Sequence, residues 1–325
     1  MKKTIALLLL TAILLLTACG TQTAPDPEGL VIPVGTLNGN TGVASAWLME
    51  QARLGCTEDT YDFELFTAPD QVTAALLSGQ IQIAALPTNV AAALYNRSDG
   101  LIQMAAIVAY GVLHVLENGD EVHAVADLTG RTIHTTGQGA GPEFILNHIL
   151  IQNGLTPGVD VTVEFHPNEA LAALMASGQI DLAMMPEPMV TSVLAQNEDI
   201  RHALDMTAEW EAVGDGSALI MSALVVRTDF AEEHPEAVLR FLELYRQSIE
   251  ETVQNPAEVA QLIAYFEIIP SAAIAERAIP GCNLTFIAGA AMEPAITGYF
   301  AVLYAAYPPS IGGAIPDASF FFIGP

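Results

Sequence analysis

Lysine is almost absent from this 325-residue chain: Lys2 and Lys3 are the only two, and both stand at its beginning. A lysine Schiff base and a phosphate-loop lysine are therefore excluded for the rest of the chain. Basic residues are scarce as a class, because ten Lys and Arg oppose 37 Asp and Glu and leave a formal net charge of −27. This charge repels nucleic-acid phosphates and anionic lipid headgroups, so the sequence excludes a nucleic-acid-binding protein.

Charged residues of either sign are also few, at 14%, whereas hydrophobic residues reach 52%. This composition excludes a disordered chain, because it supplies ample apolar surface for a buried core. The length suffices for two domains of ordinary size.

The beginning of the chain is typical of an export signal. A basic start precedes an apolar run over residues 5–16, which is too short to span a bilayer comfortably. Residues 16–19 (LTAC) resemble a bacterial lipobox, whose cysteine becomes the lipidated first residue of the mature protein. We therefore predict a lipoprotein signal peptide over residues 1–18 and a polar tether over 19–28, lipidated at Cys19 and anchored to the outside of the cell membrane. The alternative is an ordinary signal in which Cys19 is incidental.

Two further cysteines, Cys56 and Cys282, complete the set of three. In an oxidising exterior they can pair with each other, or both can be buried thiols, and the sequence leaves both readings open. Neither has a metal-ligand spacing.

The strongest internal signal is a repeated segment. Residues 78–87 (SGQIQIAALP) match residues 177–186 (SGQIDLAMMP). Helical apolar periodicity precedes each copy, a glycine ends that helix, and an apolar strand then runs to a proline before the next helix. The unit is a helix–strand–helix element used twice, which is too few copies for a solenoid.

The same order of elements recurs around each copy. We predict strands over residues 30–37 and 61–66 in the first half, and over 131–136 and 161–165 in the second, with helices between them. This alternation predicts two α/β domains with largely parallel sheets. Residues 102–116, with a hinge at Tyr110 and Gly111, and residues 219–226 are the expected crossings between the domains.

The predicted fold class is therefore α/β, a two-lobed clamshell whose two α/β domains are joined by two crossing strands. The last third of the chain is predicted to be helical, with residues 235–253 the clearest amphipathic helix, and to pack on the first lobe. Lobe I is expected over residues 29–111 and 219–325, and lobe II over residues 112–218.

A series of short motifs runs across nearly the whole mature chain. They are LNG and TG within residues 37–42, LPTN at 86–89, ADLTGRTI at 126–133, GQGAGPE at 137–143, NGL at 153–155, PEP at 186–188 and IGG at 311–313. In this order the chain resembles the type II, periplasmic-binding-protein-like substrate-binding proteins of bacterial ABC importers. It is most similar to the branch that binds nitrate, sulfonate, taurine or thiamine pyrimidines.

The resemblance implies an extracytoplasmic receptor that closes around a small ligand by a hinge, makes no covalent bond and needs no cofactor. Its implied partners are a membrane permease and a cytoplasmic ATPase, and we expect it to act as a monomer. Lipid anchoring at Cys19 fits, because such receptors in single-membrane bacteria carry a lipid anchor.

By the same resemblance, the turns after equivalent strands line the cleft, where ligands of α/β sheets bind. The predicted ligand-binding residues are Leu37, Asn38, Gly39, Asp70, Pro87, Thr88, Asn89, Tyr110, Gln138, Gly139, Ala140, Gly141 and Glu187. Several have a structural alternative: Asn38, Thr88 and Asn89 can cap their own helices. Glu187 can serve only to favour a helix start through its charge. The glycines of residues 137–141 either bring backbone amides to a ligand or only permit a turn with positive φ.

The predicted turns contain no Arg, whereas Asp70, Glu143 and Glu187 lie in or beside them. This balance favours a neutral or weakly basic ligand, such as a thiamine-pyrimidine-like heterocycle, over a sulfonate, taurine or nitrate. An arginine that enters the cleft from elsewhere, Arg97 or Arg227 for example, would remove this argument.

Motifs for enzyme chemistry are missing. The sequence has no HExxH and no GxSxG, and His134, His148 and His166 show no zinc-ligand spacing. We therefore predict no catalytic residue, no metal and no cofactor. An enzyme on the same fold, or a ligand-sensing lipoprotein that feeds no transporter, are the alternatives from other classes.

Overall fold

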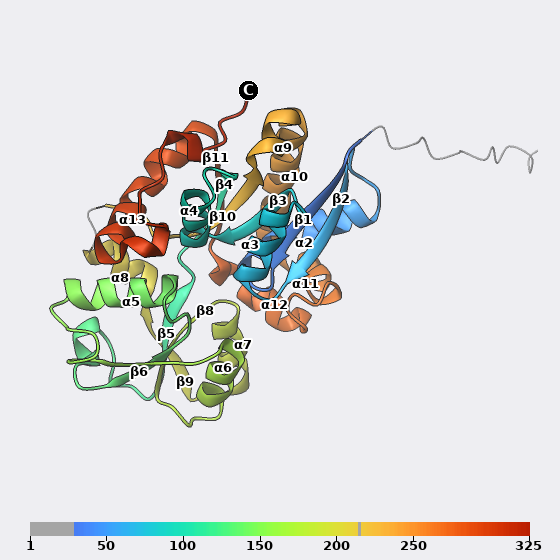
Figure 1. Ribbon diagram of the computed structural model, residues 1–325. Coiled ribbons are helices and arrows are strands. Elements are labelled where there is room, and N and C mark those ends of the chain that lie inside the picture. The colour runs from blue at the N-terminus through green and yellow to red at the C-terminus, as the bar shows by residue number, and fades with distance from the viewer. Residues whose placement is uncertain (1–28, 214–215) are drawn as a thin grey trace, which may run out of the picture.

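The computed structural model describes residues 29–213 and 216–325, which form two lobes, each built on one β-sheet with helices on both faces (Figure 1). The predicted two-lobed α/β fold is confirmed. The predicted signal peptide (residues 1–18), the tether (19–28) and Cys19 lie outside the described residues. Within the described residues, no helix is both long and apolar enough to cross a membrane.

The sheet of the first lobe has six strands in the order β11-β4-β10-β3-β1-β2. Strand β1 pairs in parallel with β2 and β3, whereas β10 pairs antiparallel with β3 and β4, and β11 antiparallel with β4. Strand β4, an interior strand of this sheet, is buried along nearly its whole length, as expected for a strand that is covered on both faces. The six strands are β1 (Val31–Leu37), β2 (Thr60–Phe66), β3 (Ile83–Pro87), β4 (Ile102–Tyr110), β10 (Ile220–Arg227) and β11 (Leu284–Ala288).

The sheet of the second lobe has five strands in the order β7-β6-β8-β5-β9. Strand β6 pairs in parallel with β7 and β8, and β5 pairs antiparallel with β8 and β9. The order β7-β6-β8 reproduces β2-β1-β3 of the first lobe, as the sequence repeat requires. The five strands are β5 (Leu113–Asn118), β6 (Thr132–Thr135), β7 (Thr162–Phe165), β8 (Leu182–Pro186) and β9 (Ile200–Asp205).

The prediction of largely parallel sheets is wrong for half of each sheet. The sequence repeats predict the parallel core correctly, because strand–helix–strand units return each strand in the same direction. The strand next to this core runs in the opposite direction in each lobe: β10 pairs antiparallel with β3 in the first, and β5 pairs antiparallel with β8 in the second. Both sheets are therefore mixed. The lobe boundaries at residues 111/112 and 218/219 stay a prediction.

The repeated helix–strand–helix unit is confirmed in both lobes. Gly79 has φ 75° at the end of the helix before β3, and Gly178 has φ 68° just after the helix before β8. Only glycine adopts this left-handed conformation without strain, so each glycine stops its helix. The helices of the two units are α3 (Pro69–Ser78) and α4 (Thr88–Arg97), and α6 (Asn168–Ala176) and α7 (Met189–Gln196).

Helices α2 (Asn40–Arg53) and α10 (Pro235–Gln254) cover one face of the first sheet. In α10, Phe241, Tyr245 and Ile249 recur at helical spacing and are buried, so the amphipathic pattern in the sequence marks the packed face correctly. Helix α9 (Thr228–Glu233) precedes α10, and α11 (Pro256–Tyr265) packs against α2. Helices α3 and α4 cover the opposite face together with α13 (Met292–Ala306).

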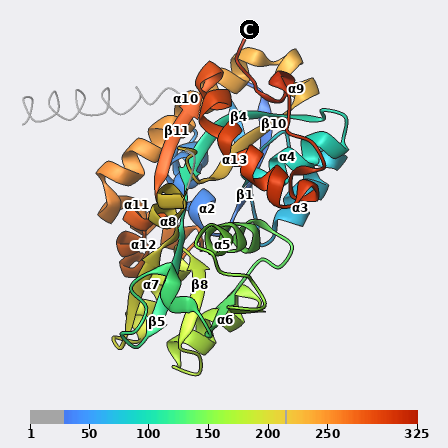
Figure 2. The same cartoon turned by 90° about the vertical axis from the view of Figure 1, so that its left-hand side faces the viewer.

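The C-terminal helices also reach the second lobe. Helix α12 (Ala272–Ala278) contacts α7, and α13 contacts α5 (Gly141–Gln152), where the two lobes meet (Figure 2). The rings of Phe144 in α5 and Tyr307 after α13 stack with centroids 5.3 Å apart. Helix α8 (Met206–Val213) adds Trp210, whose ring lies 5.6 Å from that of Tyr299. The helical tail thus packs on the first lobe and also touches the second.

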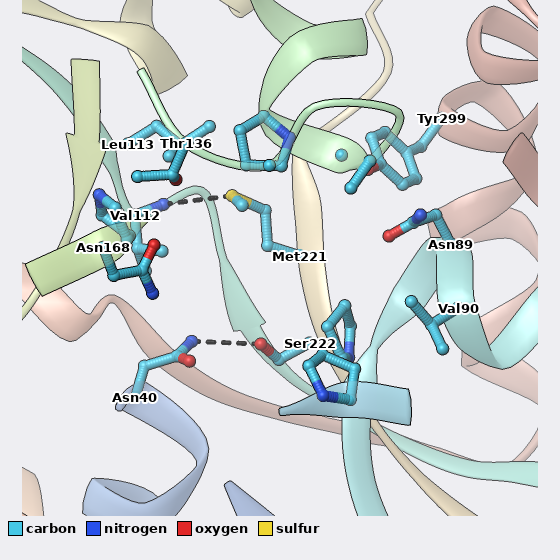
Figure 3. Close-up of a pocket in the computed structure, with 17 residues that line it drawn as sticks. Asn40, Asn89, Val90, Val112, Leu113, Thr136, Asn168, Met221, Ser222 and Tyr299 are labelled. Carbon is cyan, nitrogen blue, oxygen red and sulfur yellow. Dashed lines mark hydrogen bonds between the residues drawn. The ribbon is translucent and has the colours of Figure 1, made fainter. Parts of the chain in front are cut away.

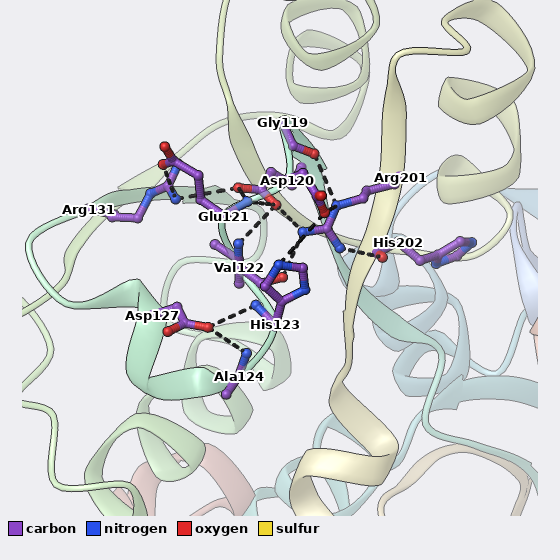
Figure 4. Close-up of polar contacts among 11 residues, drawn as sticks. Gly119, Asp120, Glu121, Val122, His123, Ala124, Asp127, Arg131, Arg201 and His202 are labelled. Atoms are coloured by element: carbon purple, nitrogen blue, oxygen red, sulfur yellow. Dashed lines mark hydrogen bonds and ion pairs between the residues drawn. The ribbon is translucent and has the colours of Figure 1, made fainter.

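An ion cluster inside the second lobe is centred on Glu117 of β5. The Glu117 carboxylate is fully buried and accepts hydrogen bonds from Arg201 Nη2 at 2.5 Å and from Arg131 Nη1 at 3.4 Å. It also accepts from the backbone N–H groups of Glu121 and Val122, both at 3.1 Å. Arg201 donates in turn to the carbonyl oxygen of Val122 at 2.8 Å (Figure 4). A buried carboxylate requires such partners, and this one ties β9 and the loop after β5 together.

The two described cysteines are both free thiols. Cys56 is exposed and Cys282 is buried, so neither the disulfide nor the pair of buried thiols allowed by the sequence is found. Burial raises the pKa of Cys282, which keeps this thiol protonated and unreactive.

Candidate ligand-binding site

A pocket of about 330 Å³ lies between the lobes, at the carboxyl ends of their parallel strands. Turns after β1, β2 and β3 line it from the first lobe, and the equivalent turns after β6, β7 and β8 line it from the second. The crossing segments and α13 complete the wall (Figure 3). Its lining residues are Asn40, Pro69, Pro87, Asn89, Val90, Val112, Leu113, Thr136, Gly137, Ala140, Gly141, Pro142, Asn168, Pro186, Met221, Ser222 and Tyr299.

The sequence repeat explains why the pocket forms there. Pro87 and Pro186 close the two copies of the repeat, and both line the pocket. Each proline ends a strand and leads into a helix, so the copies bring equivalent turns to the two sides of the pocket.

No charged side chain lines this pocket among the described residues. Instead, the N-terminal ends of α2, α4, α5 and α6 meet at it, contributing Asn40, Asn89, Gly141 and Asn168. The first N–H groups of a helix lack partners within the helix, and the helix dipole makes this end positive. The only phenol in the lining is Tyr299, whose pKa burial raises, so it stays neutral. The positive partial charge of the described lining therefore comes from these helix N-termini and not from a cationic side chain.

The polar side chains of the pocket differ in whether they already have a hydrogen-bond partner. Asn40 Nδ2 donates to Ser222 Oγ at 3.0 Å, which joins α2 to the crossing strand β10 (Figure 3). On the opposite side, the Val112 N–H donates to Met221 Sδ at 3.5 Å. Asn89 is 7% exposed, and its amide points into the pocket without a hydrogen-bond partner in the described part of the chain. The Asn89 amide can therefore donate to and accept from a molecule in the pocket.

Four of the predicted ligand-binding residues line the pocket: Pro87, Asn89, Ala140 and Gly141. An added Cβ at Gly141 would lie 3.4 Å from Asn89 Oδ1, so the two lobes come close to each other at these residues. Ligand contact stays a prediction for them and for the other nine.

The remaining predicted residues of the first lobe lie beside the pocket. Leu37, Asn38 and Gly39 stop one residue short of the lining residue Asn40, and the Asn38 N–H donates to Phe66 O at 3.0 Å. The Thr88 hydroxyl is fully buried without a partner among the described residues. Asp70 lines a neighbouring cavity of about 390 Å³, together with Arg97.

In the second lobe, Gln138 and Gly139 are exposed in the turn before α5. Gly137 and Gly139 have φ near 71° and 72°, so the turn needs glycine for its conformation, as the structural alternative required. Glu187 is buried at the start of α7 and accepts hydrogen bonds from Thr191 N at 3.1 Å and Thr191 Oγ1 at 2.9 Å. Burial raises the pKa of Glu187, although these two hydrogen bonds act to lower it. The Glu187 carboxylate faces a separate cavity.

Tyr110 ends β4 at the predicted hinge. Its N–H donates to Asn283 O at 3.1 Å, and Asn283 Nδ2 donates to Gly111 O at 3.0 Å. Asn283 is therefore hydrogen bonded to both residues of the predicted hinge. An added Cβ at Gly111 would lie 2.2 Å from Thr207 Oγ1 of α8 and 2.7 Å from Leu219 Cδ2, because α8 and the returning segment both pack directly against the first crossing.

Several lining residues were not predicted from the sequence. Asn168 could have been predicted, because it follows β7 as Pro69 follows β2 in the other copy of the repeat. Met221 and Ser222 lie on the returning strand β10, and Tyr299 comes from α13, far along the chain. Nothing local in the sequence marks these three as cleft residues.

Two α/β lobes with a pocket at their facing strand ends define the periplasmic-binding-protein-like fold of ABC-transporter substrate-binding proteins. The profile of the family described as NMT1/THI5 like matches residues 62–259. This match covers more than half of the chain, so the chain belongs to the NMT1/THI5-like family.

Comparisons with individual proteins agree. The taurine-binding periplasmic protein of Escherichia coli (strain K12) is 25% identical over 230 residues, which cover 67% of this chain and 68% of that protein. An ABC transporter structure from Parabacteroides distasonis superposes with a TM-score of 0.75 at 21% identity, over 90% of this chain and 98% of that one. The periplasmic aliphatic sulphonate binding protein of Escherichia coli gives a TM-score of 0.68 at 16% identity, over 85% and 87% of the two chains. The solved structures share the fold with this chain.

Proposed function

We propose that the chain is the extracytoplasmic solute receptor of an ABC importer, which binds a small polar organic ligand between its lobes and delivers it to a membrane permease. The observation that supports this most is the pocket at which strand–helix turns of both lobes meet. The names of the similar taurine- and sulphonate-binding proteins agree with it. Lipid anchoring at Cys19 and action as a monomer belong to the same proposal.

A receptor is favoured over an enzyme by the residues of the pocket. No His, Cys, Asp, Glu, Lys or Arg is among its described lining residues, so general acid–base catalysis and metal binding lack their usual groups there. Ser222 lies in the pocket but is hydrogen bonded to Asn40, not to a base. A ligand-sensing lipoprotein remains the second class, and ligand uptake by cells that carry the partner permease distinguishes the two.

For the ligand, we propose a small alkanesulfonate-type monoanion. A helix N-terminus stabilises an anion by about 0.3–1 kcal/mol, so four of them contribute roughly 1–4 kcal/mol. The net negative charge of the chain opposes this mainly at long range, where salt screens it beyond about 8 Å. Val90, Val112, Leu113 and Met221 give the pocket an apolar wall for a short alkyl tail. No carboxylate of the lining is available to pair with an ammonium such as that of taurine.

A neutral, thiamine-pyrimidine-like heterocycle is the second candidate. The free amide of Asn89 offers both a donor and an acceptor to a heterocycle edge. The arginines that could have removed this reading do not line the pocket: Arg97 donates to Pro309 O at 3.0 Å, and Arg227 pairs with Asp229 at 2.5 Å.

Asn89→Asp separates the two ligand classes, and Gln152→Glu is its control. Gln152 is exposed at the far end of α5, so it adds the same charge outside the pocket. The full chain, purified in mild detergent, is titrated by calorimetry with short alkanesulfonates, taurine and aminopyrimidines. A saturating ligand at a thousandfold its Kd also adds about 4 kcal/mol to the free energy of unfolding, which a thermal shift detects.

For an alkanesulfonate, the carboxylate introduced by Asn89→Asp opposes the anion at close range, and we expect affinity to fall roughly hundredfold or more. For a heterocycle, a carboxylate still accepts a hydrogen bond, so the loss stays within about tenfold. Gln152→Glu should change neither. Equal losses in both variants would overturn this pocket as the site, and no binding by either ligand class would overturn both ligand proposals.

A further inference from the structure

Three potential metal ligands come together on the second lobe, outside the pocket. Within the described residues, ligand atoms of His134, Glu164 and His166 all lie within 4.8 Å of one another. His134 is on β6 and Glu164 on β7, and they are register partners in this parallel pair. His166 follows Glu164 by two positions, so it lies on the same face of the sheet. Its N–H donates to Thr135 O at 2.9 Å, which continues the pairing beyond the end of β7.

The distances fit a metal ion. His134 Nδ1 lies 3.0 Å from His166 Nε2 and 3.4 Å from Glu164 Oε2. A tetrahedral zinc ion with ligands at about 2.0–2.2 Å holds its ligand atoms roughly 3.3–3.5 Å apart. Two of the three separations are close to this value, and the third, between Glu164 and His166, is at most 4.8 Å, so side-chain rotations can bring the three atoms onto one ion.

The surroundings leave room for a fourth ligand. The His134 side chain is 14% exposed, whereas that of Glu164, at the edge of the sheet, is 54% exposed, so water can reach the group from the Glu164 side. Asp181 also acts electrostatically on His134 and adds a second negative charge near the site. On a chain of net charge −27 the potential attracts divalent cations.

We propose that His134, Glu164 and His166 form a binding site for a divalent transition-metal ion of the zinc type, with water as the remaining ligand. Two imidazoles with one carboxylate suit zinc and its neighbours in the first transition row, while Mg²⁺ and Ca²⁺ prefer all-oxygen sites. The ion links β6 to the edge strand β7. Each histidine precedes a pocket-lining residue by two positions, His134 before Thr136 and His166 before Asn168, so the ion also fixes one side of the pocket.

The competing interpretation is a hydrogen bond between the two imidazoles, with Glu164 as a nearby counter-charge and no metal. That arrangement uses the same 3.0 Å contact between His134 and His166. It predicts no selective affinity for zinc, which makes the two interpretations separable by titration.

The test is calorimetric titration of the full chain, stripped of metal by chelation, with ZnCl₂ in the presence of a roughly thousandfold excess of Mg²⁺. We expect one zinc ion per chain. His166→Ala should weaken it by roughly a hundredfold or more, since loss even of second-shell partners costs 10–100-fold. Glu164→Gln, an exposed and nearly isosteric change, guards against misfolding and should weaken binding by roughly tenfold or more.

His123→Ala is the matched control, because it removes an exposed imidazole from the same lobe and should leave the affinity unchanged. An anomalous zinc peak between the three side chains in a soaked crystal would support the site directly. The proposal is overturned if zinc binds no more tightly than Mg²⁺, or if His166→Ala and His123→Ala reduce zinc affinity equally.

Discussion

Glu117→Gln is the change whose effect the structure defines most closely. Glutamine keeps the size and one carbonyl oxygen of the side chain but removes its charge from a fully buried position. Arg201 and Arg131 then lose the carboxylate that they share at 2.5 Å and 3.4 Å. The backbone N–H groups of Glu121 and Val122 compete for the single remaining acceptor.

The size of the destabilisation depends on the ion pairs that the two arginines keep. Removing one partner of a buried ion pair costs about 3–5 kcal/mol. Here both guanidiniums are partly exposed, and each keeps a surface carboxylate: Arg131 pairs with Glu121 at 3.0 Å, and Arg201 with Asp120 at 3.2 Å. We therefore expect the lower end, about 3 kcal/mol of the free energy of unfolding. At about 2–4 °C per kcal/mol for a protein of more than 150 residues, the melting temperature of the chain should fall by roughly 6–12 °C.

Tryptophan fluorescence can follow the second lobe where it packs against α13. Trp47 lies in α2 of the first lobe and Trp210 is buried in α8, so a Trp47→Phe background leaves Trp210 as the reporter. The control is Glu121→Gln, whose side chain is 78% exposed and pairs with the same Arg131. An exposed pair contributes about 0–1 kcal/mol, so this variant should melt close to the parent. Equal shifts for Glu117→Gln and Glu121→Gln would refute the assignment of stability to the buried cluster.

Two further predictions concern Gly111 at the hinge and the adjacent rings of His114 and His202 in the second lobe. Gly111→Ala should destabilise the chain by about 1–3 kcal/mol, because its Cβ would lie 2.2 Å from Thr207 Oγ1 and 2.7 Å from Leu219 Cδ2. Denaturant unfolding measures this loss. If the contact with Thr207 is the cause, the double variant Gly111→Ala with Thr207→Ala should recover part of it. Burial lowers the pKa of His114 and of His202, so the unfolded chain takes up protons at higher pH than the folded one. Stability is therefore full above about pH 6.5 and falls as the pH drops below it. The slope of melting temperature against pH should flatten in His114→Gln. An unchanged slope would exclude His114 as a source of the pH dependence.

Local patterns in the sequence predict the fold and part of the site. The repeat ending at Pro87 and Pro186 defines two equivalent turns, and the turn rule brings Asn89 to the cleft. Such features depend on residues close together in the chain, where periodicity and turn chemistry act. The strand directions beside each parallel core depend on how the crossings enter the sheets, which no local pattern records.

Contacts between distant segments account for what the sequence analysis missed. Tyr299 reaches the pocket only because α13 returns across the first lobe toward α5. His134 and His166 show no zinc-ligand spacing in the sequence because strand register, not spacing along one helix or loop, brings them to 3.0 Å. Likewise, the buried position of Glu187 beside Thr191 depends on packing that follows from the assembled lobe.

The polar side chains of the pocket are divided unevenly between the two walls. The first lobe contributes the side chains of Asn40, Asn89, Ser222 and Tyr299, whereas the second contributes those of Thr136 and Asn168 and otherwise chiefly backbone. A solute that meets the open molecule therefore finds most of its directional contacts on one wall and docks there first. The second lobe then closes over the bound solute and adds hydrogen bonds from its backbone amides. Binding should show two kinetic steps in rapid mixing, the second with a rate that becomes independent of solute concentration, and a single linear phase would contradict this order.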